Sequence, residues 1–280
     1  MKVVIVLSGG GAKGAYQVGA LSALYEMGLE PHVKAYTGVS VGSLNSALAA
    51  QVGMGNLHDI WKDIRSKHVY KKYGKIRSAW RLIRRGGSRS SKPLRKLIAK
   101  HIRVGMGKMS YAGASDMDMG AFKVFSSMDP NYLKGLEASS AIPAVIPPVV
   151  IDGRKYWDGG VLNMTPLGHA LSLAPDALVI ITCNPYPGLT SRPVEGKLEG
   201  LELVKRTISM LVEEGFESDI REFIYRNSQE GYRNVPFVLI SPTASIGDVD
   251  DFSENSFNWR YQVGVEDAIA HEPEIMALFE

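Results

Sequence analysis

The sequence has little cysteine and no long apolar run, the features typical of disulfide-bonded and membrane-spanning proteins. Its 280 residues include one cysteine, Cys183, so no intramolecular disulfide can form, and a reducing compartment is expected. Cys183 ends an apolar run over 177–183, where a buried small hydrophobe is expected rather than a nucleophile. No run approaches the ~20 apolar residues of a membrane span, and the run over 3–7 is too short for a signal peptide. We expect a cytoplasmic protein with peripheral membrane contact.

Acidic residues are almost absent from one part of the chain. Residues 62–108 contain 17 Lys and Arg but a single acid, Asp63, which is a net charge of +16; the overall +3 leaves −13 for the rest. Two amphipathic helices are predicted over 76–83 and 94–102, with a flexible linker over 86–91. We interpret this stretch as a basic insertion or lid in a single 1–280 domain. The simpler interpretation is a solvated insertion. The more specific interpretation is a surface that contacts an anionic membrane. No nucleic-acid-binding motif is present.

Strand-like and helix-like segments alternate along the chain. A continuous apolar run over 3–7 and a short strand-like segment over 33–36 are each followed by a glycine-containing turn and then a helical segment, over 15–27 and 41–52. Further strands are expected over 122–126, 149–151, 154–157, 177–183 and 237–241, and further helices over 132–140, 201–216 and 262–279. This order predicts an α/β fold with a mostly parallel sheet covered by helices on both faces.

Ser40 lies in the turn Gly38-Val39-Ser40-Val41-Gly42, where a predicted strand passes into a predicted helix. A sharp turn of this kind lifts the serine hydroxyl toward the substrate side of a sheet. Gly38 and Gly42 are expected because backbone meets backbone in so tight a turn. The following helix directs its first N–H groups at negative charge forming near Oγ. The pattern indicates a nucleophile.

A glycine-rich loop, Gly9-Gly10-Gly11-Ala12-Lys13-Gly14, follows the first predicted strand. It matches the dinucleotide-binding pattern, but the second strand does not end in the acid that would hold a ribose. A nucleotide P-loop is excluded because Gly14, not Ser or Thr, follows Lys13. An oxyanion hole is the remaining interpretation, since both loops follow parallel strands and open at one sheet edge.

Ser40 needs a base, and none of the histidines lies in a distinctive setting; they are His32, His58, His68, His101, His169 and His271. Asp158 is the better candidate, because Gly159 and Gly160 allow a tight turn after it. Burial near Trp157 would raise the basicity of Asp158. The simpler alternative is an Asp-Gly-Gly turn with a capping carboxylate.

The three glycine motifs, with the segments around 138–148 and 152–167, resemble the patatin-like phospholipase family over about 3–56 and 115–183. The resemblance implies a three-layer α/β/α sandwich and a Ser40–Asp158 dyad without histidine. It implies an oxyanion hole at Gly9, Gly10 and Gly11. Lys13 would either support this loop or bind a lipid phosphate. Gly14 would support the same loop. The implied activity is hydrolysis of acyl esters of phospholipids or other lipids, without metal or cofactor. A Ser-His-Asp esterase or thioesterase and a catalytically idle lipid-binding protein remain alternatives.

Overall fold

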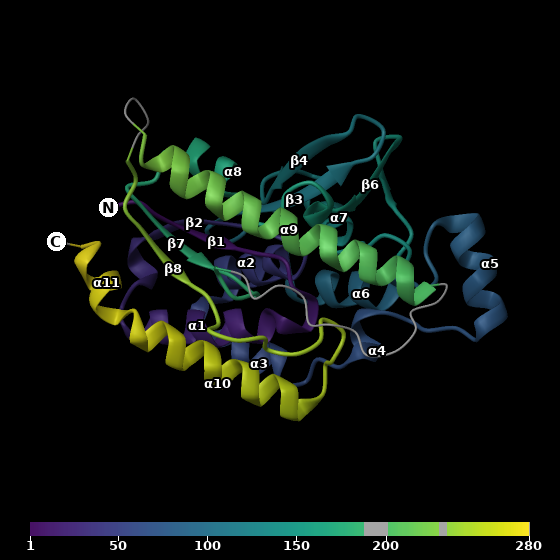
Figure 1. The fold of residues 1–280 in the computed structure, drawn as a ribbon, viewed down its shortest axis with the longest axis horizontal. Coiled ribbons are helices and arrows are strands. Elements are labelled where there is room, and N and C mark those ends of the chain that lie inside the picture. The colour runs from purple at the N-terminus through teal and green to yellow at the C-terminus, as the bar shows by residue number, and fades with distance from the viewer. Residues whose placement is uncertain (188–200, 230–233, 280) are drawn as a thin grey trace.

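The computed structural model describes residues 1–187, 201–229 and 234–279. These residues form one mixed sheet with the strand order β5-β6-β3-β2-β1-β7-β8, and β4 pairs with β3 (Figure 1). The strands are β1 (Val3–Leu7), β2 (Val33–Val39), β3 (Met109–Asp116), β4 (Ala121–Ser126), β5 (Val149–Ile151), β6 (Arg154–Asp158), β7 (Ala177–Ile181) and β8 (Phe237–Ile240). From β3 to β8 in this order the strands are parallel, whereas β4, β5 and β6 pair antiparallel. The predicted α/β class with a mostly parallel sheet is confirmed.

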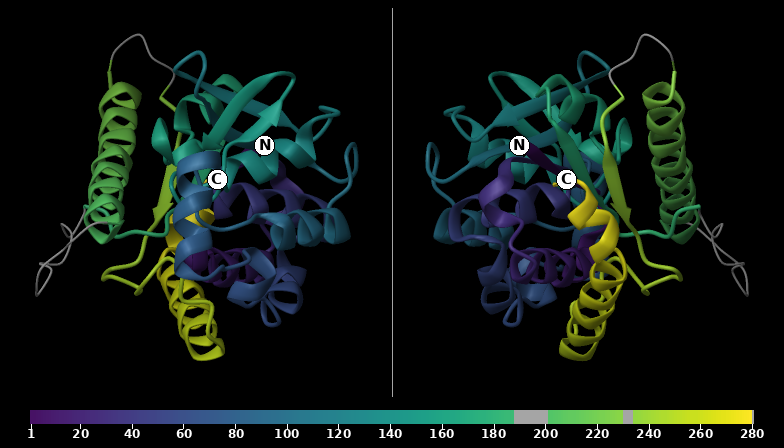
Figure 2. Two further views of the ribbon diagram at one scale, coloured as in Figure 1. Left: turned by 90° about the vertical axis from the view of Figure 1, so that its right-hand side faces the viewer. Right: turned by 90° about the vertical axis from the view of Figure 1, so that its left-hand side faces the viewer.

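Helices cover both faces of this sheet (Figure 2). They are α1 (Gly14–Glu26), α2 (Val41–Val52), α3 (Leu57–Trp61), α4 (Ser66–Val69), α5 (Lys75–Arg85), α6 (Lys92–His101), α7 (Tyr132–Ser139), α8 (Leu167–Ser172), α9 (Leu201–Asn227), α10 (Glu254–Ala270) and α11 (Glu272–Ala277). Alternation along β1 separates two cores: Val3, Ile5 and Leu7 pack with α1, α2 and α10, and Val4 and Val6 pack with α8 and α9. A central strand buried on both faces therefore reads as a continuous apolar run.

The strand β3 is absent from the sequence-based prediction, which resumes the sheet only at residue 122. Its sequence, MSYAGASD, has no β-branched run, yet β3 lies between β2 and β6 and is mostly buried. Close packing against Phe122 requires a residue without a side chain at position 113, because a Cβ on Gly113 would lie 2.2 Å from the Phe122 ring. Close packing, rather than intrinsic strand propensity, selects this segment.

Two predicted helices have different bounds in the structure. The helix expected over 201–216 is α9 and continues to Asn227. The helix expected over 262–279 begins earlier, as α10, where the Ser253 hydroxyl accepts a hydrogen bond from the Ser256 N–H at 3.3 Å. It is interrupted at His271, which separates α10 from α11. The serine cap was the signal available in the sequence.

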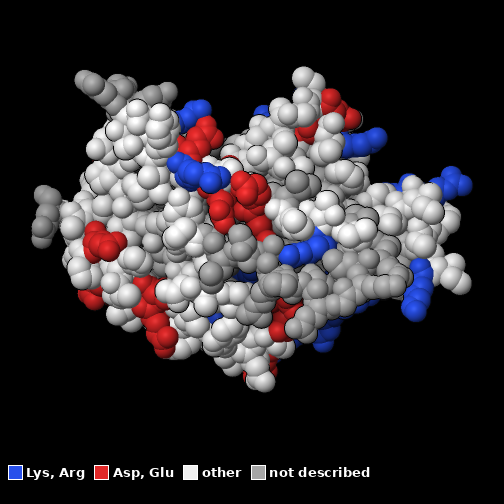
Figure 3. Space-filling view, in the orientation of Figure 1, with Lys and Arg blue, Asp and Glu red and all other residues white. Residues whose placement is uncertain are grey.

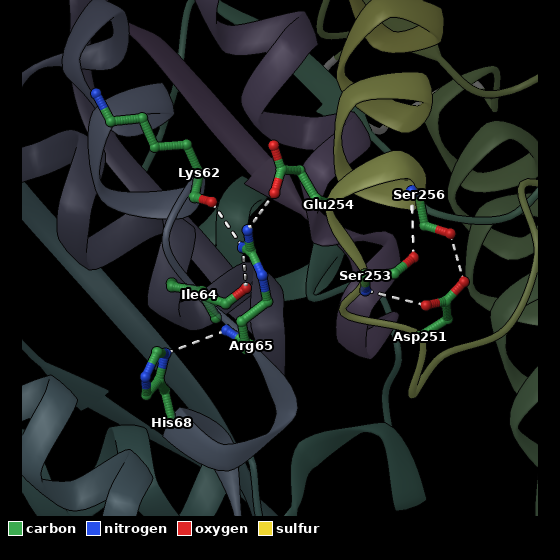
Figure 4. A network of polar contacts seen from close by, with 8 residues as sticks. All are labelled: Lys62, Ile64, Arg65, His68, Asp251, Ser253, Glu254 and Ser256. Carbon is green, nitrogen blue, oxygen red and sulfur yellow. Dashed lines mark hydrogen bonds and ion pairs between the residues drawn. The ribbon is translucent and has the colours of Figure 1, made fainter.

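The basic segment is partly built into the domain. Arg65 pairs with Glu254 at the start of α10 at 2.9 Å and also donates to the Lys62 and Ile64 carbonyls (Figure 4). Leu94 and Ile98 of α6 are buried in the main core. In contrast, α5 projects at one end of the molecule (Figures 1 and 2). Among the described residues, no helix is long and apolar enough to cross a bilayer.

Candidate active site

Ser40 occupies the sharp turn between β2 and α2. Its backbone has φ 54° and ψ −127°, a conformation that non-glycine residues rarely adopt and that is frequent at functional sites. The turn is tight because a Cβ on Gly42 would lie 2.2 Å from the Leu7 carbonyl oxygen, and one on Gly38 would lie 2.4 Å from Gly42. The Ser40 N–H donates to Ser139 Oγ at 2.9 Å, which ties the turn to the end of α7.

Strand register brings Asp158 beside Ser40. Val39 pairs with Gly113, and the next residue of β3, Ala114, pairs with Asp158 at the end of the antiparallel strand β6. Gly159 is required at this point, since a Cβ there would lie 2.4 Å from the Gly113 carbonyl oxygen. Residues 118 positions apart in sequence therefore meet at the edge where the parallel strands end.

The Asp158 carboxyl group is buried, and this burial raises its pKa from 3.8 to about 7. Hydrogen bonds from the Gly160 N–H, at 2.9 Å to Oδ1, and from the Ser40 hydroxyl act in the opposite direction. Asp158 also caps the short helical turn that follows it, as the simpler interpretation of this motif expected. Capping and contact with Ser40 are thus combined in one carboxyl group.

The glycine loop lies against Ser40, because a Cβ on Gly9 would come within 3.3 Å of Ser40 Cβ. The Gly9 N–H is engaged, donating to the Met164 carbonyl at 3.2 Å. Within the described part of the chain, the N–H groups of Gly10 and Gly11 have no backbone or side-chain acceptor. Gly11 has a φ of 57°, a left-handed backbone conformation that favours glycine at this position. Of the three amides predicted for the oxyanion hole, those of Gly10 and Gly11 therefore have no acceptor among the described residues, whereas that of Gly9 is engaged.

Lys13 lies behind the loop. Its Nζ donates to Asn184 Oδ1 at 2.8 Å, and burial lowers the pKa of the ammonium group. This contact connects the loop to the segment after β7.

Gly14 packs against the start of α2, where a Cβ would lie 2.4 Å from Val41 Cγ2. Gly160, the last predicted glycine, lies against Met164, 3.0 Å from its sulfur by the same measure.

Asp219 of α9 is a site neighbour that sequence reasoning missed. Its Oδ2 accepts from the Met164 and Thr165 N–H groups at 2.7 and 3.0 Å. Burial raises the pKa of this carboxyl to about 6. Since the Met164 carbonyl holds Gly9, Asp219 supports the glycine loop through one intermediate residue. Asp219 has no motif around it, and only the docking of α9 on the sheet reveals the connection.

The histidines lie elsewhere, and none of their recorded contacts involves Ser40 or Asp158. His169 makes a 3.1 Å contact from Nδ1 to Thr37 Oγ1, and burial lowers its pKa. His32 packs on Phe279, and His271 lies 3.0 Å from Glu274. Cys183 is fully buried, which raises the pKa of its thiol to about 12, as expected for a packing residue. The described residues contain no group of three or more metal-ligating side chains.

This arrangement defines a class: an α/β fold carrying a serine on a strained strand-to-helix turn, next to a buried carboxyl and a glycine-rich loop. The family model for patatin-like phospholipases matches residues 5–171, more than half of the chain. The chain belongs to the patatin-like phospholipase family, a family of serine lipid hydrolases.

Two curated relatives and one solved structure are similar to this chain at low sequence identity. A lysophospholipase nte1 of Aspergillus terreus is 24% identical over 227 residues, covering 71% of this chain and 13% of the relative. An uncharacterized NTE family protein of Mycobacterium tuberculosis is 23% identical over 215 residues, covering 75% of this chain and 57% of that protein. The chain thus spans only part of both relatives. The human GIVD cytosolic phospholipase A2 structure aligns with a TM-score of 0.54 at 11% identity, covering 99% of this chain and 62% of that one; this likeness concerns the fold.

Proposed function

We propose that this chain is a lipid acyl hydrolase of the phospholipase A type, with Ser40 as nucleophile and Asp158 as general base. The observation that carries the proposal is the buried Asp158 carboxyl, with its pKa of about 7, facing the hydroxyl of a backbone-strained serine. A base with a pKa near neutrality is half deprotonated at pH 7 and still basic enough to accept a proton. Family membership and the relative named as a lysophospholipase support a lipid ester as substrate.

The proposed reaction has two halves. Asp158 accepts the Ser40 proton while Ser40 Oγ attacks the ester carbonyl carbon, and the N–H groups of Gly10 and Gly11 bind the resulting oxyanion. Collapse breaks the ester bond, and protonated Asp158 returns its proton to the leaving alcohol. Water then attacks the acyl-serine, losing its proton to Asp158. Collapse of this second intermediate breaks the bond between Ser40 Oγ and the acyl carbon, Asp158 returns the proton to Oγ, and the fatty acid is released.

The test is hydrolysis of mixed phospholipid vesicles, with released lipids identified by mass spectrometry. Ser40→Ala and Asp158→Asn are each expected to abolish release, whereas Ser228→Ala, an exposed serine on the chain after α9, retains it. A fluorophosphonate probe is expected to label the wild type at Ser40. Undiminished hydrolysis by either site variant refutes the dyad.

The two alternatives predict different outcomes in the same experiment. A Ser-His-Asp esterase or thioesterase requires one histidine whose replacement abolishes activity. A catalytically idle lipid-binding protein predicts vesicle binding without hydrolysis or probe labelling. No contact described above favours either alternative over the dyad.

A further inference from the structure

A cavity lies away from Ser40, between α5 and α6. It has a volume of about 740 Å³, within the range of roughly 300–1,000 Å³ usual for ligand pockets, and α7, Pro147–Pro148 and β5 complete its wall. Its lining includes six cationic side chains, from Arg77, Arg81, Arg85, Lys92, Arg95 and Lys134. Neither Ser40 nor Asp158 lines it. The cavity is therefore distinct from the candidate active site.

The cations of this cavity are poorly neutralised. Its one lining acid, Glu137, is buried and already used: it accepts from Arg95 at 2.8 and 2.9 Å and from Ser91 Oγ at 2.7 Å. The other five cations form no ion pair with any residue that the structure describes. Five uncompensated charges around one space favour an anion there.

Arg81 is a buried cation in the cavity wall with an unused hydrogen-bond donor. It is only 7% exposed, its Nη2 donates to the Arg89 carbonyl at 2.8 Å, and its Nε has no hydrogen-bond partner among the described residues. The Tyr73 ring lies 4.8 Å from its guanidinium and 4.6 Å from that of Arg77. A buried charge with an unused donor is costly to maintain, and a bound anion would satisfy it.

The outer face of α5 is apolar and exposed. Ile76, Trp80 and Ile83 follow helical spacing and are 89%, 52% and 83% exposed. In Figure 3 the end of the molecule formed by α5 shows blue basic side chains among white ones. The helix thus has cations toward the cavity and Ile76 and Ile83 toward solvent, and Trp80 is partly exposed and also lines the cavity. That combination suits the boundary between headgroups and acyl chains of a bilayer.

We propose that this cavity binds the phosphate headgroup of an anionic phospholipid while Ile76, Trp80 and Ile83 insert into the same bilayer. Charge complementarity selects the occupant, because a second copy of this surface would bring like charges together. The site is separate from substrate hydrolysis, and its existence does not depend on Ser40 chemistry. It would hold the enzyme at the membrane while another lipid occupies the active site.

The test measures co-sedimentation of the full chain carrying Ser40→Ala, so that vesicles stay intact whatever the activity. Vesicles of phosphatidylcholine alone are compared with vesicles that also contain phosphatidylserine or a phosphatidylinositol phosphate. Binding is expected only with anionic lipid. Equal binding to phosphatidylcholine vesicles overturns the proposal.

Two double variants that remove equal charge distinguish binding in the cavity from general electrostatic attraction to the vesicle surface. Arg77→Gln with Arg85→Gln should weaken binding about thirtyfold, since each basic residue near an anionic surface contributes about 1 kcal/mol. The matched control, Lys96→Gln with Lys100→Gln, removes equal charge from exposed positions outside the cavity and should weaken it less. Equal losses in both pairs overturn the cavity assignment.

Two further measurements address the apolar face and the source of the anion. Ile83→Ala, at an exposed α5 position that does not line the cavity, should reduce vesicle binding but leave protection by soluble inositol hexakisphosphate against thermal unfolding unchanged. Inorganic phosphate protecting as well as inositol hexakisphosphate, while vesicles fail to bind, would overturn the lipid assignment. Dimerisation that Ile83→Ala abolishes, or RNA binding in place of vesicle binding, would do the same.

Discussion

Replacing Asp158 by Asn is expected to remove activity and to stabilise the fold. The change keeps the shape and the acceptor for the Gly160 N–H but removes a charge that burial disfavours. The Asp158 pKa is about 7 against an ordinary 3.8, and each unit corresponds to about 1.4 kcal/mol, so ionisation costs the folded protein about 4 kcal/mol above pH 7. The variant avoids this cost.

The sign of the effect follows from proton binding. Between about pH 4 and pH 7 the folded protein keeps a proton on Asp158 that the unfolded chain has lost. The free energy of unfolding of the wild type therefore falls, through this group, as the pH rises across that range. Below about pH 4 both states are protonated, and the contribution of the group is constant.

The assay is urea denaturation of wild type and Asp158→Asn at pH 5 and pH 8. Other titrating groups cancel in the difference between the two proteins, which should grow by about 3 kcal/mol in favour of the variant from pH 5 to pH 8. Ser40→Ala removes a hydrogen bond that lowers the Asp158 pKa, so its stability should continue to fall above pH 7. A difference that does not change with pH would refute a raised pKa at Asp158.

Three further outcomes are expected. The kcat/KM for vesicle hydrolysis should rise with pH to a plateau above about 7, because Asp158 must be deprotonated, and a flat profile would contradict this role. Gly42→Ala should destabilise the fold by about 3 kcal/mol or more in thermal unfolding, since its Cβ meets the Leu7 carbonyl, whereas Gly168→Ala has open space and should be nearly neutral. Asp219→Asn should lower kcat about tenfold with little change in KM, by loosening the Met164 contact to the glycine loop; an unchanged kcat would show that the contact does not position the loop.

Patterns within short stretches of the sequence predict the local elements of the site. Glycines at 38 and 42 mark a turn that only small residues can make, and the strand and helix around it follow from an apolar run and an alanine-rich segment. The same reasoning predicted the glycine loop and the strands over 149–151 and 154–157 that precede Asp158. These features depend on residues close together in the chain, so their patterns are readable without the fold.

How these elements combine depends on packing between segments that are far apart in the chain. The strand β3 was missed because its small residues have weak strand propensity, and its pairing with both β2 and β6 is what places Asp158 beside Ser40. The engagement of the Gly9 amide by Met164, and the support of Met164 by Asp219, depend on chain segments far apart in sequence. The raised pKa of Asp158 likewise comes from burial, a property of the packed environment rather than of neighbouring residues.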